Sequence, residues 1–276
     1  MDYKTYIPGA VCLILALVIM IRLMHYAPFY APSYFFWIGA ILALVGIISI
    51  VNPLDFLFIV DRKTALAVFC GGILMSVISL YWPTEVYHSK TNLKIDAFLP
   101  DYSFNECHEV RINASPEAVR QALQATGVGD IPAIHLLLKI RGIENKDLSH
   151  KATGTQQSTD IFSTPDFNFF VADSTEFISV MILKASAKTP PPEVTTAQQF
   201  RAFNKPGYVK VAFNFRFISL GNGQTLISTE TRNYAITKED ARIFGRYWRI
   251  IYPGSAIIRR LWLDTLDKKA GENINL

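Results

Sequence analysis

The sequence predicts an α+β protein in which three membrane-spanning helices precede a curved antiparallel sheet and a long C-terminal helix. Three observations lead to this fold class. Residues 1–90 hold only five of the 27 Lys and Arg and four of the 23 Asp and Glu, so uncharged runs are concentrated there. Residues 209–217 alternate between apolar and polar side chains, as in a half-buried strand. Residues 238–252 repeat apolar side chains at helical spacing.

The first 90 residues are predicted to form a membrane anchor, and residues 91–276 a separate domain. Three apolar runs approach the roughly 20 residues that a helix needs to cross the hydrocarbon core; they are residues 6–24, 34–51 and 64–82. The third run ends in Tyr81-Trp82-Pro83, which is typical of a membrane interface. A cleaved signal peptide is a less favoured interpretation of the first run, because no small-x-small cleavage pattern follows it.

The predicted spans have the character of an anchor. No Asp, Glu or Lys lies at the middle of a run, and a transport or proton path would ordinarily require a polar group there. Basic residues are nearly balanced between the two sides, and the loop Asp61-Arg62-Lys63 beside a span favours a cytoplasmic N terminus and an exported domain. We therefore expect a multi-pass protein of a bacterial cytoplasmic membrane. Close helix packing would use four glycines: Gly39, Gly46, Gly71 and Gly72.

Composition argues against several classes of partner. The net charge of +4 is small and mixed in sign, so nucleic acid is not an expected partner. The three cysteines suggest no disulfide framework. The five histidines form no set with metal-ligand spacing, so we expect neither a metal nor a cofactor. The partners we expect are the lipid bilayer and a hydrophobic small molecule, and the sequence names no protein partner.

The second part is predicted to run strand, two helices, several antiparallel strands and a long terminal helix. Ser115-Pro116-Glu117 supplies an N-cap, a proline at the first helical position and an acid in the first turn. The expected elements are a strand at 102–112, helices at 116–125 and 131–141, and a loosely strand-like segment at 149–164. They continue with strands at 167–173 and 176–185, a helical turn at 198–203, and a hairpin of 209–217 with 225–236 around Gly221-Asn222-Gly223. A helix follows at 238–252, which Pro253-Gly254 breaks before it resumes at 255–269.

This order describes a helix-grip fold, in which the terminal helix covers the concave face of the sheet and leaves an apolar chamber between them. Three segments resemble the SRPBCC superfamily, also called START-like or Bet v 1-like: SFNECHEVRINASPEAVRQAL, VKVAFNFRFISLGNGQTLISTETRNYAI and FGRYWRIIYPGSAIIRRLWLDTL. The resemblance covers about residues 100–270 and implies a chamber that binds lipids, sterols, polyketides or other hydrophobic ligands. Some members of the superfamily are cyclases or oxygenase subunits. The resemblance concerns fold more than activity, because it includes no catalytic signature.

The candidate ligand-binding residues come from the hairpin and the closing helix. Glu230 and Arg232 leave the same face of their strand, opposite Asn214 and Ala212. They would either orient a ligand head group at the chamber wall or form a cross-strand charge pair on the outer face. The apolar character of the phenylalanine face favours the second interpretation. The full set is Phe213, Phe215, Phe217, Glu230, Arg232, Phe244, Trp248 and Ile251.

Other polar features carry less information about function. Arginines alternate with rings on the closing helix and are interpreted as its solvated face, because acidic residues interrupt the charge; they are Arg242, Arg246, Arg249, Arg259 and Arg260. The stretch Glu106-Cys107-His108-Glu109 offers metal-ligand residue types, but strand alternation sends Glu106 and His108 to one face and the other two residues to the opposite face. Neither a G-x-S-x-G elbow nor a phosphate-binding loop is present, and no residue is assigned as catalytic.

Three functions are compatible with these features. The leading hypothesis is a non-enzymatic, membrane-tethered module that binds a lipid or another hydrophobic small molecule in the chamber. The alternative is a cyclase-like or hydrolase-like enzyme that uses Glu230, His108 or His135 as acid or base, which requires two titratable groups to converge inside the chamber. A third is an interaction domain whose interior is filled by its own side chains.

Overall fold

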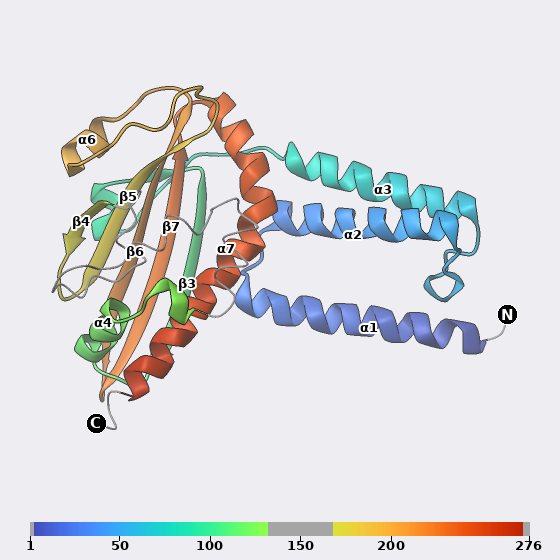
Figure 1. Ribbon diagram of the computed structural model, residues 1–276, viewed down its shortest axis with the longest axis horizontal. Helices are drawn as coiled ribbons and strands as arrows, with labels where there is room; N and C mark the ends of the chain where they lie inside the picture. The colour runs from blue at the N-terminus through green and yellow to red at the C-terminus, as the bar shows by residue number, and fades with distance from the viewer. Residues whose placement is uncertain (1–2, 132–167, 273–276) are drawn as a thin grey trace. The chain divides into compact units, whose positions relative to one another are not determined.

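The computed structural model describes residues 3–131 and 168–272. Contacts divide the chain into two compact units (Figure 1). The first unit comprises Met1–Pro83 together with Gly245–Pro253, and the second comprises Thr84–Phe244 together with Gly254–Leu276. A short piece of the C-terminal helix, which the sequence analysis assigned to the second part, therefore belongs with the N-terminal helices.

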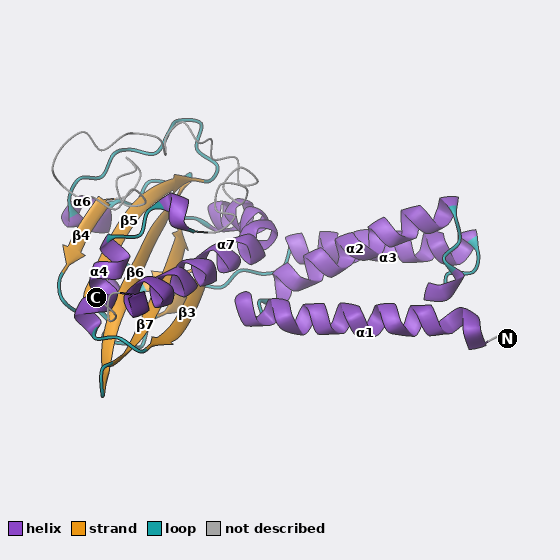
Figure 2. Ribbon diagram, turned by 60° about the horizontal axis from the view of Figure 1, so that its bottom comes forward, coloured by secondary structure: helices purple, strands orange, loops and turns teal. Residues whose placement is uncertain are grey.

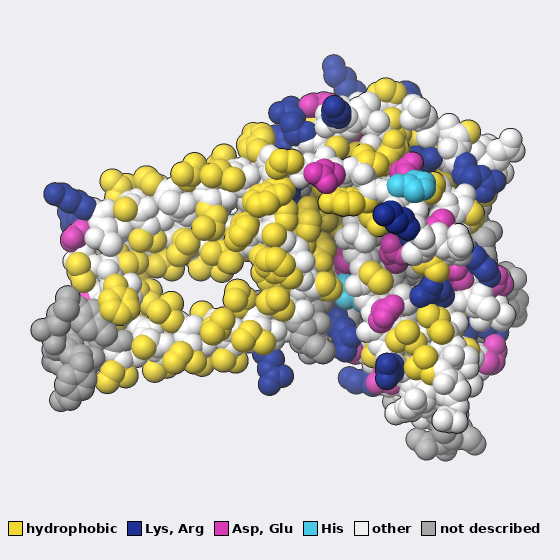
Figure 3. Space-filling view, turned by 180° about the vertical axis from the view of Figure 1, so that it is seen from behind, with side chains coloured by type: hydrophobic (Ala, Val, Ile, Leu, Met, Phe, Trp, Pro, Cys, Tyr) yellow, Lys and Arg dark blue, Asp and Glu magenta, His cyan; other side chains and the backbone are white. Residues whose placement is uncertain are grey.

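The first unit contains the helices α1 (Tyr3–Tyr26), α2 (Ala31–Val51) and α3 (Arg62–Leu80), with the short helix η1 (Asp55–Leu57) before α3. Hydrophobic side chains predominate on the visible surface of these helices, and basic side chains lie near their ends (Figure 3). Helices α2 and α3 are long and apolar enough to cross a membrane. In α1 the apolar segment Ile7–Arg22 is shorter than these two helices among the residues that the structure describes. The prediction of three spanning helices is therefore supported for two.

Helices α2 and α3 pack with their backbones in close contact. A Cβ atom added to Gly39 would lie 2.7 Å from the carbonyl oxygen of Gly72, and one added to Gly72 would lie 2.4 Å from the amide nitrogen of Ala43. Gly46 is equally confined, since its Cβ would lie 2.4 Å from the amide nitrogen of Phe69. Gly71 has nothing within 4 Å, so the prediction that it contributes to close packing is wrong.

The C-terminal helix α7 (Lys238–Glu272) is a single helix with Pro253 inside it, whereas the sequence analysis predicted a break at this proline. Proline has no N–H, so the carbonyl four residues earlier, that of Arg249, loses its helical partner. The hydroxyl of Ser33 donates to this carbonyl at 2.7 Å, and the indole N–H of Trp37 donates to the carbonyl of Ile250 at 3.1 Å. The helix continues because side chains of α2 supply hydrogen bonds at the proline.

Arg249 joins this part of α7 to the end of α3. Its side chain is buried, and its guanidinium donates to the carbonyls of Leu80 at 2.7 Å and Trp82 at 2.6 Å. The C-terminal end of a helix leaves carbonyls without helical partners and carries partial negative charge, which favours a cation there. Burial lowers the pKa of Arg249, but a guanidinium keeps its charge because its ordinary pKa is so high. Arg249, predicted to be solvated, is therefore buried inside the first unit.

The second unit is built on a five-stranded antiparallel sheet with the strand order β3-β7-β6-β5-β4 (Figure 2). The strands are β3 (Phe104–Ile112), β4 (Asn168–Ala172), β5 (Glu176–Lys184), β6 (Tyr208–Gly221) and β7 (Gln224–Ala235). Other described elements are β1 (Tyr87–His88), η2 (Lys94–Ala97), β2 (Asp101–Tyr102), α4 (Pro116–Gln124), η3 (Val128–Asp130) and α6 (Ala197–Ala202). The α+β class and most predicted elements are confirmed. The helix predicted at 131–141 and the segment at 149–164 lie essentially outside the described residues.

The β6–β7 hairpin sets the register of the sheet. Asn222 and Gly223 form its turn with φ of 51° and 72°, a conformation that glycine and asparagine tolerate best. The predicted pairing is confirmed, because Glu230 lies opposite Asn214 and Arg232 lies opposite Ala212.

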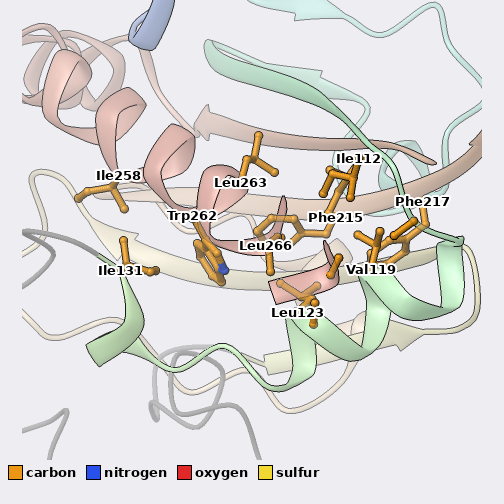
Figure 4. Close-up of a cluster of buried hydrophobic side chains, with 14 of the residues drawn as sticks. Ile112, Val119, Leu123, Ile131, Phe215, Phe217, Ile258, Trp262, Leu263 and Leu266 are labelled. Atoms are coloured by element: carbon orange, nitrogen blue, oxygen red, sulfur yellow. The ribbon is translucent and has the colours of Figure 1, made fainter. Parts of the chain in front are cut away.

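Each face of the sheet carries its own apolar core. On one face, the phenylalanines of β6 pack against α4 and the C-terminal half of α7 (Figure 4). The rings of Phe215 and Trp262 lie 4.8 Å apart in this core. On the other face, Ala212 and neighbouring side chains of β5 pack against Ile95 and Leu99, which follow the N-terminal helices, and against Phe200 of α6. Residues 93–99 are therefore part of the core of the second unit.

Two neighbouring glycines give a matched test of the α2–α3 packing. Gly72→Ala places a Cβ atom 2.4 Å from the backbone of α2, and we expect it to lower the free energy of unfolding by about 1–3 kcal/mol. Gly71→Ala enters open space and should be neutral or slightly stabilising, since alanine favours helix. Thermal unfolding of the detergent-solubilised full chain measures both. Equal unfolding temperatures for the two variants would contradict the close packing.

A double-mutant cycle tests the hydrogen bond at the proline of α7. Ser33→Ala leaves the carbonyl of Arg249 without a donor, and we expect a loss of about 1–3 kcal/mol. In a Pro253→Ala background the helix supplies its own N–H, so the same change should have a much smaller effect. Ser49→Ala is the control, because that hydroxyl bonds a carbonyl within its own helix. If Ser33→Ala lowered the free energy of unfolding equally in the wild-type and Pro253→Ala backgrounds, the hydroxyl would not have this role.

Candidate functional site

The face of the sheet that meets α7 carries buried polar side chains beside its aromatic core. Glu106 and His108 on β3 lie opposite Thr231 and Thr229 on β7. These threonines lie in turn opposite the phenylalanines of β6 that pack against α7. Directly opposite residues share a face of a sheet, so this polar group points toward α7. The prediction that Glu106 and His108 share one face is confirmed.

Glu106 and His108 are hydrogen-bonded to each other inside the domain. Oε1 of Glu106 lies 2.8 Å from Nε2 of His108, and their side chains are 0% and 4% exposed. The second carboxyl oxygen of Glu106 and the amide nitrogen of Asn233 are buried as well, and neither has a hydrogen-bond partner in the described part of the chain. A buried polar group without a partner costs about 1–3 kcal/mol, so such groups call for an explanation.

Arg259 reaches this face from α7. Its guanidinium donates to the hydroxyl of Thr229 at 3.2 Å and to that of Thr231 at 2.8 Å. The same guanidinium lies over aromatic rings, with its central carbon 4.8 Å from the ring centroid of Phe213 and 5.8 Å from that of Trp262. Predicted to be solvated, Arg259 is half-buried in contact with the sheet. We call Glu106, His108, Thr229, Thr231, Asn233 and Arg259 the polar cluster.

The polar cluster combines groups suited to one end of an amphipathic molecule. It presents a carboxyl group, an imidazole, two hydroxyls, an amide and a guanidinium on one side of the sheet, next to phenylalanine rings. Binding sites for small molecules are commonly apolar surfaces with a few convergent polar groups that fix orientation. Among the described residues no group of three His, Cys, Asp or Glu side chains could hold a metal ion.

The apolar residues predicted to line the chamber belong partly to the second unit and partly to the first. Phe213, Phe215 and Phe217 lie in a cluster of buried side chains to which α4 and α7 also contribute (Figure 4). Phe244 packs against the ring of Phe104 in the second unit, with centroids 5.5 Å apart. Trp248 and Ile251 belong to the first unit. The contact of these residues with a ligand stays a prediction.

Glu230 and Arg232 lie on the opposite face of the sheet from α7. They share the face of Ala212, which belongs to the core around Ile95 and Leu99. Of the two predicted alternatives, the outer face is therefore correct, but the face is covered, since the side chains of Glu230 and Arg232 are only 12% and 2% exposed.

Arg232 uses all of its donors inside the protein. Nε donates to the carboxylate of Glu230 at 2.7 Å. One terminal nitrogen donates to the carboxylate of Asp96 at 2.5 Å and to the carbonyl of Leu99 at 3.1 Å. The other terminal nitrogen donates to the carboxylate of Glu230 at 3.2 Å and to the hydroxyl of Ser89 at 3.4 Å. A guanidinium has five N–H groups, so no donor is left for a ligand. The geometry favours a structural role, in which Arg232 holds the segment of Asp96 and Leu99 against the sheet.

An open surface pocket of about 380 Å³ lies at a different position in the domain. It is lined by Pro190 and Pro192 of the proline-rich connection and by Phe203, Lys205 and Tyr208. Tyr208 belongs to the core on the face opposite α7. This pocket is therefore not the chamber that the sequence predicts between the sheet and the terminal helix.

Comparisons with known proteins identify no family. No protein-family model and no curated protein matches the chain. Among solved structures, a hypothetical protein jhp0584 from Helicobacter pylori is 11% identical with a TM-score of 0.29, and the match covers 66% of this chain and 96% of that one. The protein TTHA0849 from Thermus thermophilus is 12% identical with a TM-score of 0.26, over 62% and 99% of the two chains. TM-scores this low carry no argument about fold or function.

Sequence reasoning missed Thr229, Thr231, Asn233 and Arg259. A signal for three of them was present, because β7 is polar at every position of Ser228 to Asn233, on both faces of a strand in the middle of the sheet. Continuous polarity in a central strand indicates that both faces hold polar groups in the interior. Arg259 gave no comparable signal, since an arginine on an amphipathic helix is ordinarily solvated.

We expect the ion pair of Arg232 with Asp96 to stabilise the fold in a pH-dependent way. Burial alone would raise the pKa of Asp96, but hydrogen bonds from Arg232, Ser89 and Thr91 outweigh it and hold the pKa below the ordinary value of 3.8. This contribution is therefore complete above pH 3.8 and is lost as the pH falls through the lowered pKa. We expect Asp96→Asn to reduce the free energy of unfolding by about 1.5–3 kcal/mol at pH 7 and by progressively less below pH 3.8.

The measurement is chemical unfolding of the full chain at a series of pH values. Asp267→Asn is the matched control, because this carboxylate is exposed on α7. A difference between wild type and Asp96→Asn that stays constant from pH 7 to pH 3 would show that the Arg232 contact does not depend on the ionised carboxylate.

Proposed function

We propose that the protein is a membrane-tethered module that binds a lipid or another hydrophobic small molecule between the sheet and α7. One observation carries the proposal. The polar cluster is buried against aromatic side chains, and it includes a carboxyl oxygen and an amide nitrogen that lack partners in the described part of the chain. An amphipathic ligand would give these groups partners while its apolar body contacts the rings.

The N-terminal unit is consistent with a ligand that comes from a membrane. Helices α2 and α3 have the length and composition of membrane spans. In the proposal α1 is a third span or lies at the membrane surface, and the chain is a multi-pass protein of a bacterial cytoplasmic membrane with an exported domain. A domain held beside a bilayer has direct access to molecules that partition into it. The resemblance of residues 100–270 to the SRPBCC superfamily, and the helix-grip arrangement it implies, support the same interpretation.

An enzymatic role is the second candidate, and a specific observation favours it. Glu106 and His108 are two titratable groups that meet at 2.8 Å in the interior, on the face toward α7. A carboxyl–imidazole pair beside an apolar surface could move a proton to or from a bound molecule. Of the three residues suggested as acid or base from the sequence, His108 is the one this geometry supports. Glu230 lies on the other face, and His135 is outside the described residues.

Photolabelling tests whether the domain itself takes up apolar molecules. The full chain in native membranes is treated with a diazirine-bearing alkyl probe, irradiated and mapped by peptide mass spectrometry. We expect labelled peptides from β3, β7 and the C-terminal half of α7, and we expect excess unlabelled lipid extract to suppress this labelling. Helices α2 and α3 are the internal control, since contact with the bilayer should label them without competition.

Labels confined to α1, α2 and α3 would contradict the proposal and support a domain filled by its own side chains. Suppressed labelling of the domain together with turnover of a competing lipid would support the enzymatic candidate.

A further inference from the structure

We propose, on the basis of the proposed function, that Glu106 and Asn233 form a subsite for an uncharged hydroxyl group, so that the ligand is a lipid alcohol. The side chains of both residues are buried, since the residues as a whole are 3% and 2% exposed. The amide nitrogen of Asn233 and Oε2 of Glu106 have no hydrogen-bond partner in the part of the chain that the structure describes.

The sheet places these two groups next to each other. Glu106 lies opposite Thr231, and Asn233 lies opposite Phe104, which precedes Glu106 by two residues on β3. Glu106 and Asn233 are therefore diagonal neighbours on the face toward α7. Diagonal neighbours in an antiparallel pair have Cα atoms about 7–8 Å apart, which lets one small group between long side chains contact both.

Neighbouring polar groups of the cluster already have partners. Oε1 of Glu106 is bonded to His108, and the hydroxyls of Thr229 and Thr231 accept hydrogen bonds from Arg259. The two buried atoms that lack a partner in the described part of the chain are an acceptor, Oε2 of Glu106, and a donor, the amide nitrogen of Asn233. A ligand group that pairs with both must therefore donate one hydrogen bond and accept another.

A hydroxyl group is the simplest group that does both, because it carries one donor and two acceptor lone pairs. A methyl ether or an ester carbonyl accepts from Asn233 and leaves the carboxyl oxygen of Glu106 without a donor. A carboxylate or a fully ionised phosphate accepts from Asn233 but has no hydrogen to donate to the carboxyl oxygen of Glu106. An ammonium group has no acceptor for Asn233, and it would lie near the guanidinium of Arg259 and the imidazole of His108.

Competition among three ligands of equal chain length tests the subsite. Hexadecanol, hexadecyl methyl ether and hexadecanoic acid are used to displace the photoactivatable alkyl probe from the domain of the full chain. We expect hexadecanol to compete at a concentration at least tenfold lower than the ether or the acid, because only the alcohol pairs both buried groups.

Asn233→Leu removes the donor while keeping a similar volume, and we expect it to reduce the preference for the alcohol over the ether to less than threefold. Asn105→Leu is the matched control, since Asn105 is exposed on the neighbouring strand and lies opposite Arg232, on the other face of the sheet. This control should keep the full preference. If Asn233→Leu does not fold, the ranking of the three ligands on the wild-type chain decides by itself.

Equal competition by alcohol and ether, or strongest competition by the acid, would overturn the hydroxyl subsite while leaving the proposed function intact. Failure of all three ligands, together with no labelling of the domain, would overturn the proposed function as well.

Discussion

The register of the β6–β7 hairpin determines which polar side chains face α7. Successive residues of a strand point to opposite faces, so a slip of one residue would exchange Thr229 and Thr231 for Glu230 and Arg232. The turn at Asn222 and Gly223 holds the register, since it needs a backbone conformation that few residues adopt without strain. With this register, β7 delivers hydroxyls to the face toward α7 and a salt bridge to the other face. The candidate site and the contact of Arg232 with Asp96 and Leu99 both follow from this register.

Three arginines show how the surroundings decide what a guanidinium does. Arg232 has two carboxylates, a carbonyl and a hydroxyl around it, so each of its five donors is used and the group is structural. Arg249 donates to carbonyls at the end of α3, where the helix dipole favours a cation. Arg259 donates to two hydroxyls and lies over aromatic rings. Only the last of these lies in the polar cluster on the face toward α7.

Helix α7 contributes to both units of the protein. Its segment Gly245–Pro253 belongs with the N-terminal helices, and Gly254–Leu276 belongs with the sheet. The boundary falls at Pro253, the residue at which the helix lacks one of its own hydrogen bonds. Ser33 and Trp37 of α2 donate to carbonyls next to this point, and one continuous helix contributes to the N-terminal unit and also covers the sheet.

The sequence by itself determined the elements and the faces of the strands. Runs of apolar residues located α2 and α3, alternation located β6, and a three-residue turn at Gly221-Asn222-Gly223 predicted the pairing of Glu230 with Asn214. The structure has this pairing, with a two-residue turn and a register shift between Ser219 and Gly221. These features are local, because periodicity and turn chemistry depend on neighbours in the chain. The tertiary structure alone decided that α7 continues through Pro253, that residues 93–99 cover the outer face of the sheet, and that Arg259 lies against Thr231. Each of these depends on a partner far away in the sequence, and nothing in the local pattern specifies which partner will satisfy a carbonyl, a carboxylate or a guanidinium.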